Sequence, residues 1–166
     1  MDLGRDLEII SMQEQELQLQ QFNADVAWQL GLRLRELALS RKASVVIDVR
    51  RFGEPLFYSA MPGTSPNNFE WVRRKNNIVA RFYRSSYAIG LSLQHQNKSL
   101  YEHYGLSPEH YKAHGGSFPL TVAGAGIIGS VTVSGLPERG DHELVVEALC
   151  EQIGRDYAPL ALPIAT

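Results

Sequence analysis

The chain has 166 residues, of which 16 are Lys or Arg and 18 are Asp or Glu, so its formal net charge is −2. This length suits one domain with a sizeable core. The near-neutral charge gives no general reason to expect nucleic-acid binding. Cys150 is the only cysteine, which excludes an intramolecular disulfide and predicts a buried thiol.

The amino terminus predicts no export. Residues 1–10 include Asp2, Asp6 and Glu8 without an apolar run, unlike a secretory signal or a transit peptide. The longest apolar stretches are interrupted well before the roughly 20 residues that a membrane-spanning helix needs. We therefore expect a cytoplasmic protein with no membrane span.

Two helices are expected first. Apolar residues at helical spacing predict an amphipathic helix over residues 3–21, with a polar, Gln-rich and partly exposed second half. Asn23 is a good N-cap for a second helix, whose apolar stripe continues to Ser40.

A hairpin and a third helix follow. Residues 44–50 and 55–61 are rich in β-branched and aromatic side chains around a Gly53-Glu54 turn, which predicts two antiparallel strands. Residues 69–83 show helical spacing again, with their basic side chains mostly off the apolar stripe.

The second half of the chain predicts a short helix, a second hairpin and a closing helix. Ser107 resembles the N-cap of a helix that ends near Gly115-Gly116. Strands are expected at residues 118–123 and 127–134, and a helix with acids in its first turn at residues 141–153.

This element order lacks strand–helix alternation, so we predict an α+β fold in which helices flank an antiparallel sheet. One domain is expected over residues 1–156, followed by a loose tail at residues 157–166. In the last strand, Val131 and Val133 share one face, which should pack on helices. Thr132 and Ser134 share the other face, which should be open to a partner.

Residues Gly124 to Gly129 match the GxGxxG pattern of dinucleotide-binding proteins. In that site a helix begins after the glycines and its N–H groups face a phosphate. Here the following residues have the pattern of a strand, so a hairpin turn is predicted.

Four histidines lie close together in the sequence, at His95, His103, His110 and His114. The i, i+4 spacing of the last two would place both rings on one face of a helix, as two-histidine metal sites require. No third ligand has suitable spacing, so exposed histidines without a metal are predicted. A planar metal cofactor, which needs one or two axial imidazoles, stays open.

No catalytic set is recognisable. The sequence has no Gly-x-Ser-x-Gly elbow, and Cys150 lies in the middle of a predicted helix rather than at its amino terminus. The acids of Asp141-His142-Glu143 are typical of a first helical turn, where they interact with the helix dipole. Whether the protein is an enzyme therefore stays open.

Basic residues concentrate in one segment. Residues 71–101 contain six Lys or Arg and no Asp or Glu, which is typical of a solvated helix face, with an anion site as the alternative. Three sequence pieces combine flat surfaces with anion-binding donors: Arg50-Arg51-Phe52-Gly53, Trp71 with Arg73 and Arg74, and His114-Gly115-Gly116-Ser117. Together they could hold a flat acid.

Three ordered motifs carry a family resemblance. His114-Gly-Gly-Ser-Phe-Pro119, then Gly126 to Gly135 ending in Val-Ser-Gly, then Asp141-His-Glu-Leu-Val-Val146 resemble the GlcG-like, haem-degrading domain family. The upstream residues 45–53, 71–75 and 84–87 resemble one branch of that family, so the resemblance covers nearly the whole chain. The resemblance implies a profilin-like fold, homo-oligomers, and haem or corrinoid binding in some members.

The leading hypothesis is a homo-oligomeric binding module, a dimer or larger, for a small anionic and planar ligand, with haem as the named candidate. Its site would comprise Arg73, Arg74, His114, Gly115, Gly116 and Ser117. The arginines would bind carboxylates and the Gly-Gly backbone would donate N–H groups. The alternative is an assembly or chaperone-associated interaction protein without small-molecule chemistry, whose partner contacts the Gln-rich amino-terminal helix.

Overall fold

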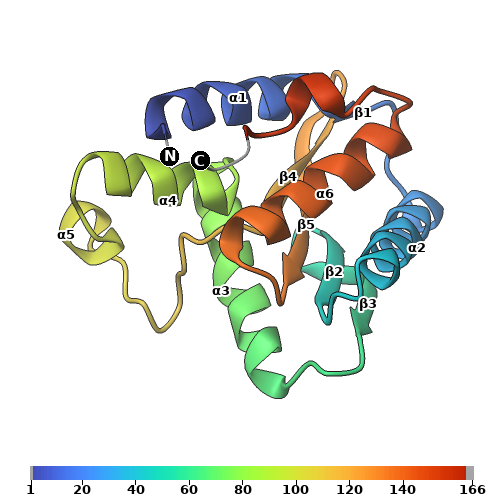
Figure 1. The fold of residues 1–166 in the computed structure, drawn as a ribbon, viewed down its shortest axis with the longest axis horizontal. Helices are drawn as coiled ribbons and strands as arrows, with labels where there is room; N and C mark the ends of the chain where they lie inside the picture. The colour runs from blue at the N-terminus through green and yellow to red at the C-terminus, as the bar shows by residue number, and fades with distance from the viewer. Residues whose placement is uncertain (1, 164–166) are drawn as a thin grey trace.

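A computed structural model describes residues 2–163, in which six α-helices surround one five-stranded sheet (Figure 1). The helices are α1 (Leu3–Glu16), α2 (Ala24–Ser40), α3 (Pro66–Phe82), α4 (Ser86–His95), α5 (Leu100–Tyr104) and α6 (Glu138–Gln152). The strands are β1 (Gln18–Leu19), β2 (Val46–Arg51), β3 (Glu54–Ala60), β4 (Ser117–Val122) and β5 (Gly126–Ser134).

The sheet has the order β1-β4-β5-β2-β3. The pairs β2–β3, β2–β5 and β4–β5 are antiparallel, whereas the short β1 pairs in parallel with β4. The predicted α+β class, with helices flanking a mainly antiparallel sheet, is thus confirmed, as are both hairpins. The glycine-rich segment forms the turn between β4 and β5, as predicted, with positive φ at Gly124 and Gly126.

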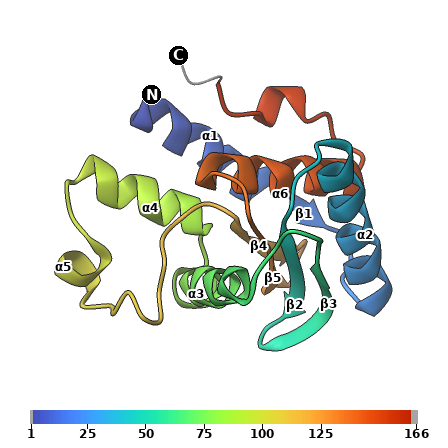
Figure 2. The ribbon, with the colours of Figure 1, turned by 60° about the horizontal axis from the view of Figure 1, so that its bottom comes forward.

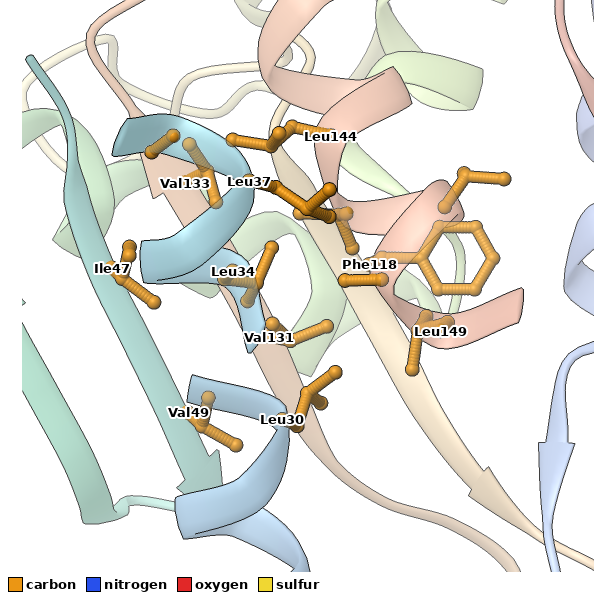
Figure 3. Close-up of a cluster of buried hydrophobic side chains, with 14 of the residues drawn as sticks. Leu30, Leu34, Leu37, Ile47, Val49, Phe118, Val131, Val133, Leu144 and Leu149 are labelled. Carbon is orange, nitrogen blue, oxygen red and sulfur yellow. The ribbon is translucent and has the colours of Figure 1, made fainter. Parts of the chain in front are cut away.

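One face of the sheet is apolar and lies under α2 and α6. Figure 3 shows Leu34 of α2 and Leu144 of α6 beside Val131 and Val133 of β5 and Phe118 of β4. These five side chains are almost completely buried. Burying a side chain of this size contributes roughly 1.5–3 kcal/mol, so this face supplies most of the hydrophobic stabilisation. Cys150 is buried in the same cluster, as predicted.

The other face of the sheet is polar and lies under α3 (Figure 2). Thr132 and Ser134 were expected to face an open surface, and both are instead buried. The reason is that α3 contributes polar side chains of its own. Asn76 accepts hydrogen bonds from Thr132 and Ser130, and Lys75 donates to the carbonyl of Val133. Hydrogen-bonded polar groups can be buried at little cost.

The amino-terminal helix is shorter than predicted. It ends at Glu16, and the next residues form β1, with Leu17 and Leu19 in the core. The Gln-rich half is therefore only partly helical, but it is partly exposed as predicted, at Gln15, Gln18, Gln20 and Gln21. Gln13 is itself buried, where its side chain donates to the carbonyl of Leu160 at 2.7 Å.

Other predictions about helices were also wrong. The residues after Ser107 form turns rather than a helix, so His110 and His114 do not share a helical face. Helices α4 and α5 were not predicted at all, and α6 begins at Glu138 rather than Asp141.

The described part of the segment after Asp156, which ends at Pro163, packs on the rest of the domain. Leu160 and Leu162 are buried, and Arg139 donates to both Asp6 and the carbonyl of Pro163. Residues 164–166 lie outside the described part.

Across residues 2–163, no helix is both long enough and apolar enough to cross a membrane.

Candidate functional site

The first half of α3 presents Trp71 to a cluster of nitrogen-bearing side chains. The rings of Trp71 and His114 have centroids 5.2 Å apart. The guanidinium carbon of Arg74 lies 4.9 Å from the centroid of the indole, and the Lys112 ammonium lies 5.2 Å from it. Cations at this distance interact favourably with the face of an indole. The indole of Trp71 is therefore flanked by two cations.

The Gly115-Gly116 pair places His114 beside the Trp71 indole. A Cβ atom on Gly115 would lie 1.9 Å from the carbonyl oxygen of Glu138, and one on Gly116 would lie 2.3 Å from that of Val133. Gly116 also has φ of +126°, a conformation that favours glycine. Other residues would therefore push this loop away from α6 and β5, and move His114 with it.

Two hydrogen bonds fix the same loop to the start of α4. The Ser86 hydroxyl donates to the carbonyl of His114 and accepts from the backbone N–H of Ser117 at 3.0 Å. Since Ser86 is fully buried, this link is protected from water. The loop thus holds His114 in a defined position.

A buried ion pair lies behind the loop. Lys75 Nζ is 2.9 Å from Asp141 Oδ2, and Asp141 Oδ1 accepts the backbone N–H of Leu136 at 2.9 Å. Burial lowers the pKa of Lys75, and the negative charge of Asp141 acts in the opposite direction. Lys75 was expected on a solvated helix face and Asp141 as a dipole-stabilising acid. Both are instead buried and join α3 to α6.

The imidazole of His114 is favoured in its neutral form. Burial lowers its pKa, the carboxylate of Glu138 opposes this effect, and the cations Lys112, Lys75 and Arg74 reinforce it. Nδ1 is the nitrogen that faces Glu138, at 3.7 Å from Oε2. When Nδ1 carries the proton, Nε2 has a free lone pair and can accept a hydrogen bond or bind a metal ion.

His114 and Glu138 lie between two depressions. The first, here called the α3–α6 pocket, has a volume of about 450 Å³ and includes Trp71 and Lys75. The second, the α4–α5 groove, has a volume of about 500 Å³, with Leu93, Leu100 and Leu106 among its walls and Lys98 at its edge. Ligand sites usually have such volumes and mainly apolar walls, and the walls of the α4–α5 groove are mainly apolar, whereas most residues that line the α3–α6 pocket are polar.

Comparison with known proteins identifies the family. A family model described as haem degrading protein HbpS-like matches residues 22–150. A UPF0303 protein from Burkholderia mallei is 59% identical over 162 residues, which covers 98% of both chains. A UPF0303 protein from Paraburkholderia phytofirmans is 57% identical with the same coverage. The chain belongs to the HbpS-like haem-degrading protein family.

Solved structures share the fold of this HbpS-like chain. The Ybr137w protein superposes with a TM-score of 0.86 at 23% identity, covering 92% of each chain. HbpS superposes with a TM-score of 0.63 at 18% identity, covering 83% of this chain and 94% of its own. PduOC, crystallised as a haem complex, superposes with a TM-score of 0.67 at 18% identity. The match covers 78% of this chain and 93% of PduOC. At these identities the likeness concerns the fold alone.

The sequence-predicted site residues of this HbpS-like protein fall into two groups. Arg74 and His114 both contact Trp71. Arg73 instead donates to the Glu70 carboxylate at 3.0 Å and to the carbonyl of Glu109 at 2.9 Å. Arg74 also donates to backbone carbonyls, those of Glu70 and Pro108, while its guanidinium carbon lies over the indole.

The other three predicted residues form the loop itself. Gly115 and Gly116 lie against the carbonyls of α6 and β5, and the Ser117 hydroxyl lies 2.8 Å from that of Thr132 inside the protein. Their predicted contact with a ligand stays a prediction.

Four residues near the site were absent from the predicted set: Lys75, Lys112, Glu138 and Asp141. Glu138 lies beside His114 only in the folded chain, and Lys112 lies near the Trp71 indole and acts on His114 through its charge. Within residues 2–163, no group of three His, Cys, Asp or Glu side chains could hold a metal ion.

Proposed function

We propose that this protein binds a small, planar, anionic ligand beside His114, with haem as the named candidate. One observation carries the proposal: the partly buried imidazole of His114 lies between two depressions, beside the Trp71 indole, the cations Arg74 and Lys112 and the carboxylate of Glu138. Support also comes from the family and from the haem complex of PduOC.

The residues around the groove fit such a ligand. The leucines of the α4–α5 groove provide an apolar wall for a macrocycle, and Lys98 and Lys112 can bind carboxylates at its edge. His114 Nε2 is the nitrogen available for iron. Bound haem would supply redox-active iron. The lysines would bind its carboxylates, and the leucines would orient the macrocycle and exclude water from the face that packs on them.

Titration of the purified protein with hemin tests this proposal. We expect a shift of the Soret band that saturates with added protein, and its loss in His114→Ala. The matched control is His103→Ala, which removes an exposed imidazole that lines neither depression. An unshifted Soret band at micromolar protein, or equal binding by both variants, would contradict the proposal.

We also propose that the protein forms homo-oligomers. Three large apolar side chains on the outer side of α2 are exposed, namely Trp28, Leu32 and Leu39. Exposed apolar patches of this kind are typical of protein interfaces. Light scattering after size exclusion, across a hundredfold dilution, should give a mass above the 18.5 kDa of one chain. In Trp28→Ser/Leu39→Ser the mass should fall toward that value.

The same α2 surface would serve the alternative function, an assembly or chaperone-associated interaction protein. Under that alternative, Trp28→Ser/Leu39→Ser loses its protein partner while hemin has no effect on any variant. Deleting residues 1–20 is not a useful test, because it removes Ile10, Leu17 and Leu19 from the core.

A further inference from the structure

A third depression lies at the opposite end of α3 from Trp71, here called the Arg50 pocket. It has a volume of about 290 Å³, and Arg50, Phe52, Tyr83 and Ser130 are among its walls. At a rise of about 1.5 Å per residue, Trp71 and Tyr83 are separated by about 18 Å along α3. The Arg50 pocket is therefore distinct from the site around His114.

Asp48 holds the guanidinium of Arg50 in a fixed orientation. Arg50 Nε donates to Asp48 Oδ1 and one terminal nitrogen donates to Oδ2, both at 2.6 Å. Asp48 is almost completely buried, whereas Arg50 is partly exposed at the pocket. A guanidinium has five N–H donors, so Arg50 retains donors beyond those that Asp48 accepts. A planar donor group oriented in advance suits a carboxylate.

Ser130 supplies an acceptor in the same pocket. Its hydroxyl donates to Asn76 Oδ1 at 2.7 Å, and Asn76 Nδ2 in turn donates to Asp48 Oδ1 at 3.3 Å. Because the hydroxyl hydrogen is directed at Asn76, the lone pairs of the Ser130 oxygen can accept from a ligand. The pocket thus presents a cationic donor and a neutral acceptor.

Two aromatic side chains form the rim, and both have an unusual backbone. Phe52 has φ of 50° and Tyr83 has φ of 54°, and their residues are 70% and 64% exposed. Phe52 occupies the hairpin turn and Tyr83 ends α3, two positions where glycine or asparagine would relieve the strain. Bulky residues in left-handed conformations concentrate at ligand sites. The two turns themselves do not require an aromatic residue, so a role of both rings in ligand binding would account for them.

We propose that the Arg50 pocket binds a small aromatic carboxylate that carries a ring N–H, as in an indole or pyrrole carboxylate. The carboxylate binds Arg50, the ring N–H donates to Ser130, and the flat ring lies between Phe52 and Tyr83. Val79, Ala80 and Ile127 supply the apolar wall. The volume is at the lower end for small-molecule sites, which suits one or two rings rather than a tetrapyrrole.

Isothermal titration calorimetry on the full-length protein tests the ligand class with three probes. Indole-2-carboxylate should bind. Indole lacks the carboxylate, and cyclohexanecarboxylate lacks the flat ring and the N–H, so each should bind about tenfold more weakly or worse, because a charge-assisted hydrogen bond or an aromatic contact is lost. No binding of indole-2-carboxylate at millimolar concentration, or equal binding of indole, would overturn the proposal.

Phe52→Gly separates binding from folding. Glycine adopts φ of 50° without strain, so thermal stability should be kept, while affinity for indole-2-carboxylate falls about 3- to 10-fold through loss of an aromatic contact. Lys42→Gly is the matched control, because Lys42 has φ of 53° and lies outside the pocket. Its affinity should equal that of the natural protein.

Two more variants complete the test. Arg50→Lys keeps a positive charge beside Asp48 but loses the planar donors, so it should also weaken binding. His114→Ala should leave the binding of indole-2-carboxylate unchanged. Full affinity in both Phe52→Gly and Arg50→Lys, or loss of affinity in His114→Ala, would place the ligand elsewhere and overturn the proposal.

Discussion

The two faces of the sheet are both buried, but by opposite means. Under α2 and α6 the contacts are between aliphatic and aromatic side chains, such as Leu34, Val131 and Phe118. Under α3 they are hydrogen bonds and an ion pair, centred on Lys75 and Asn76. Apolar contacts are non-directional and tolerate small shifts, whereas buried polar groups need specific partners.

Two of the three depressions adjoin α3, on the polar side, whereas the α4–α5 groove includes no residue of α3. Trp71 belongs to the α3–α6 pocket, and Asn76 and Tyr83 belong to the Arg50 pocket. The polar layer thus holds α3 in place between two depressions, while the apolar layer supplies most of the stability. This division predicts that similar substitutions on the two faces have different consequences.

The largest expected effect is that of Lys75→Met, which leaves the Asp141 carboxylate buried without its ion-pair partner. Removing one member of a buried pair costs about 3–5 kcal/mol. On the apolar face, Leu34→Met conserves volume and should cost less than about 1.5 kcal/mol. Urea denaturation measures both free energies of unfolding.

The control for this pair is Lys98→Met, which removes an exposed lysine and should change the free energy of unfolding by less than about 0.5 kcal/mol. If Lys75→Met costs no more than Leu34→Met, the two faces do not differ in the way described.

A somewhat smaller loss is expected for Asn76→Ala. The Asn76 amide oxygen accepts from Ser117, Ser130 and Thr132, so its removal leaves three buried hydroxyls with fewer partners. The Ser117 and Thr132 hydroxyls lie 2.8 Å apart and remain partners of each other, so the loss is mainly that of the Ser130 partner, about 1–3 kcal/mol. The neighbouring Asn77→Ala is the control, since Asn77 donates only to the exposed loop carbonyl of His110. Thermal unfolding should separate the two variants clearly.

The difference between the faces also explains what the sequence could predict. Both strands of the second hairpin and the stripe of α2 followed from apolar periodicity, because a face that contacts only apolar groups leaves a regular pattern. The same reliance on apolar periodicity made the prediction for the polar face wrong, because a polar face covered by a polar helix has the same sequence pattern as a face open to water. Alternation of Val131 and Val133 with Thr132 and Ser134 is the pattern of a sheet open to water on one side.

The candidate site was only partly predictable. His114 and Arg74 were found because glycine and aromatic neighbours marked their segments. Lys75 and Asp141 were read as surface charges, since their pairing depends on bringing together residues 66 positions apart. Helix α4, with Ser86 at its start, was missed although Ser85 caps it, because its buried apolar residues form no clear stripe.

The apolar side includes a buried polar ring, His142, which gives it a pH dependence. Burial lowers the pKa of His142 to about 3. Below about pH 6.5, His142 is protonated in the unfolded chain but stays neutral in the folded protein. The free energy of unfolding therefore falls as the pH drops below about 6.5. The loss should be up to about 1.4 kcal/mol per pH unit, or about 2 kcal/mol at pH 5.

The variant His142→Gln isolates this contribution. His142 Nε2 lies 2.8 Å from Gln13 Oε1, and glutamine offers an amide N–H to the same acceptor without titrating. Burial raises the pKa of Asp141 and of Glu143, which act in the opposite direction. The difference between the natural protein and the variant removes those effects. That difference should be largest at low pH and level off above about pH 7.

The smallest effect is expected for Arg73→Ala, on the side of α3 that faces water. Arg73 forms an exposed i, i+3 ion pair with Glu70, and such pairs contribute about 0–1 kcal/mol. Its guanidinium also donates to the carbonyl of Glu109, which water can replace at little cost.

The same substitution tests the predicted ligand site, because Arg74 is its matched neighbour. Arg74 lies over the Trp71 indole, whereas Arg73 donates to the Glu70 carboxylate. We expect Arg74→Ala to weaken hemin binding more than Arg73→Ala, although both remove one charge. Soret titrations at several salt concentrations give the two dissociation constants. Their ratio distinguishes a direct contact between Arg74 and hemin from a long-range attraction between the positive charge and the hemin carboxylates. A long-range attraction would fall equally in both variants and vanish at high salt, whereas loss of a direct contact would persist in Arg74→Ala.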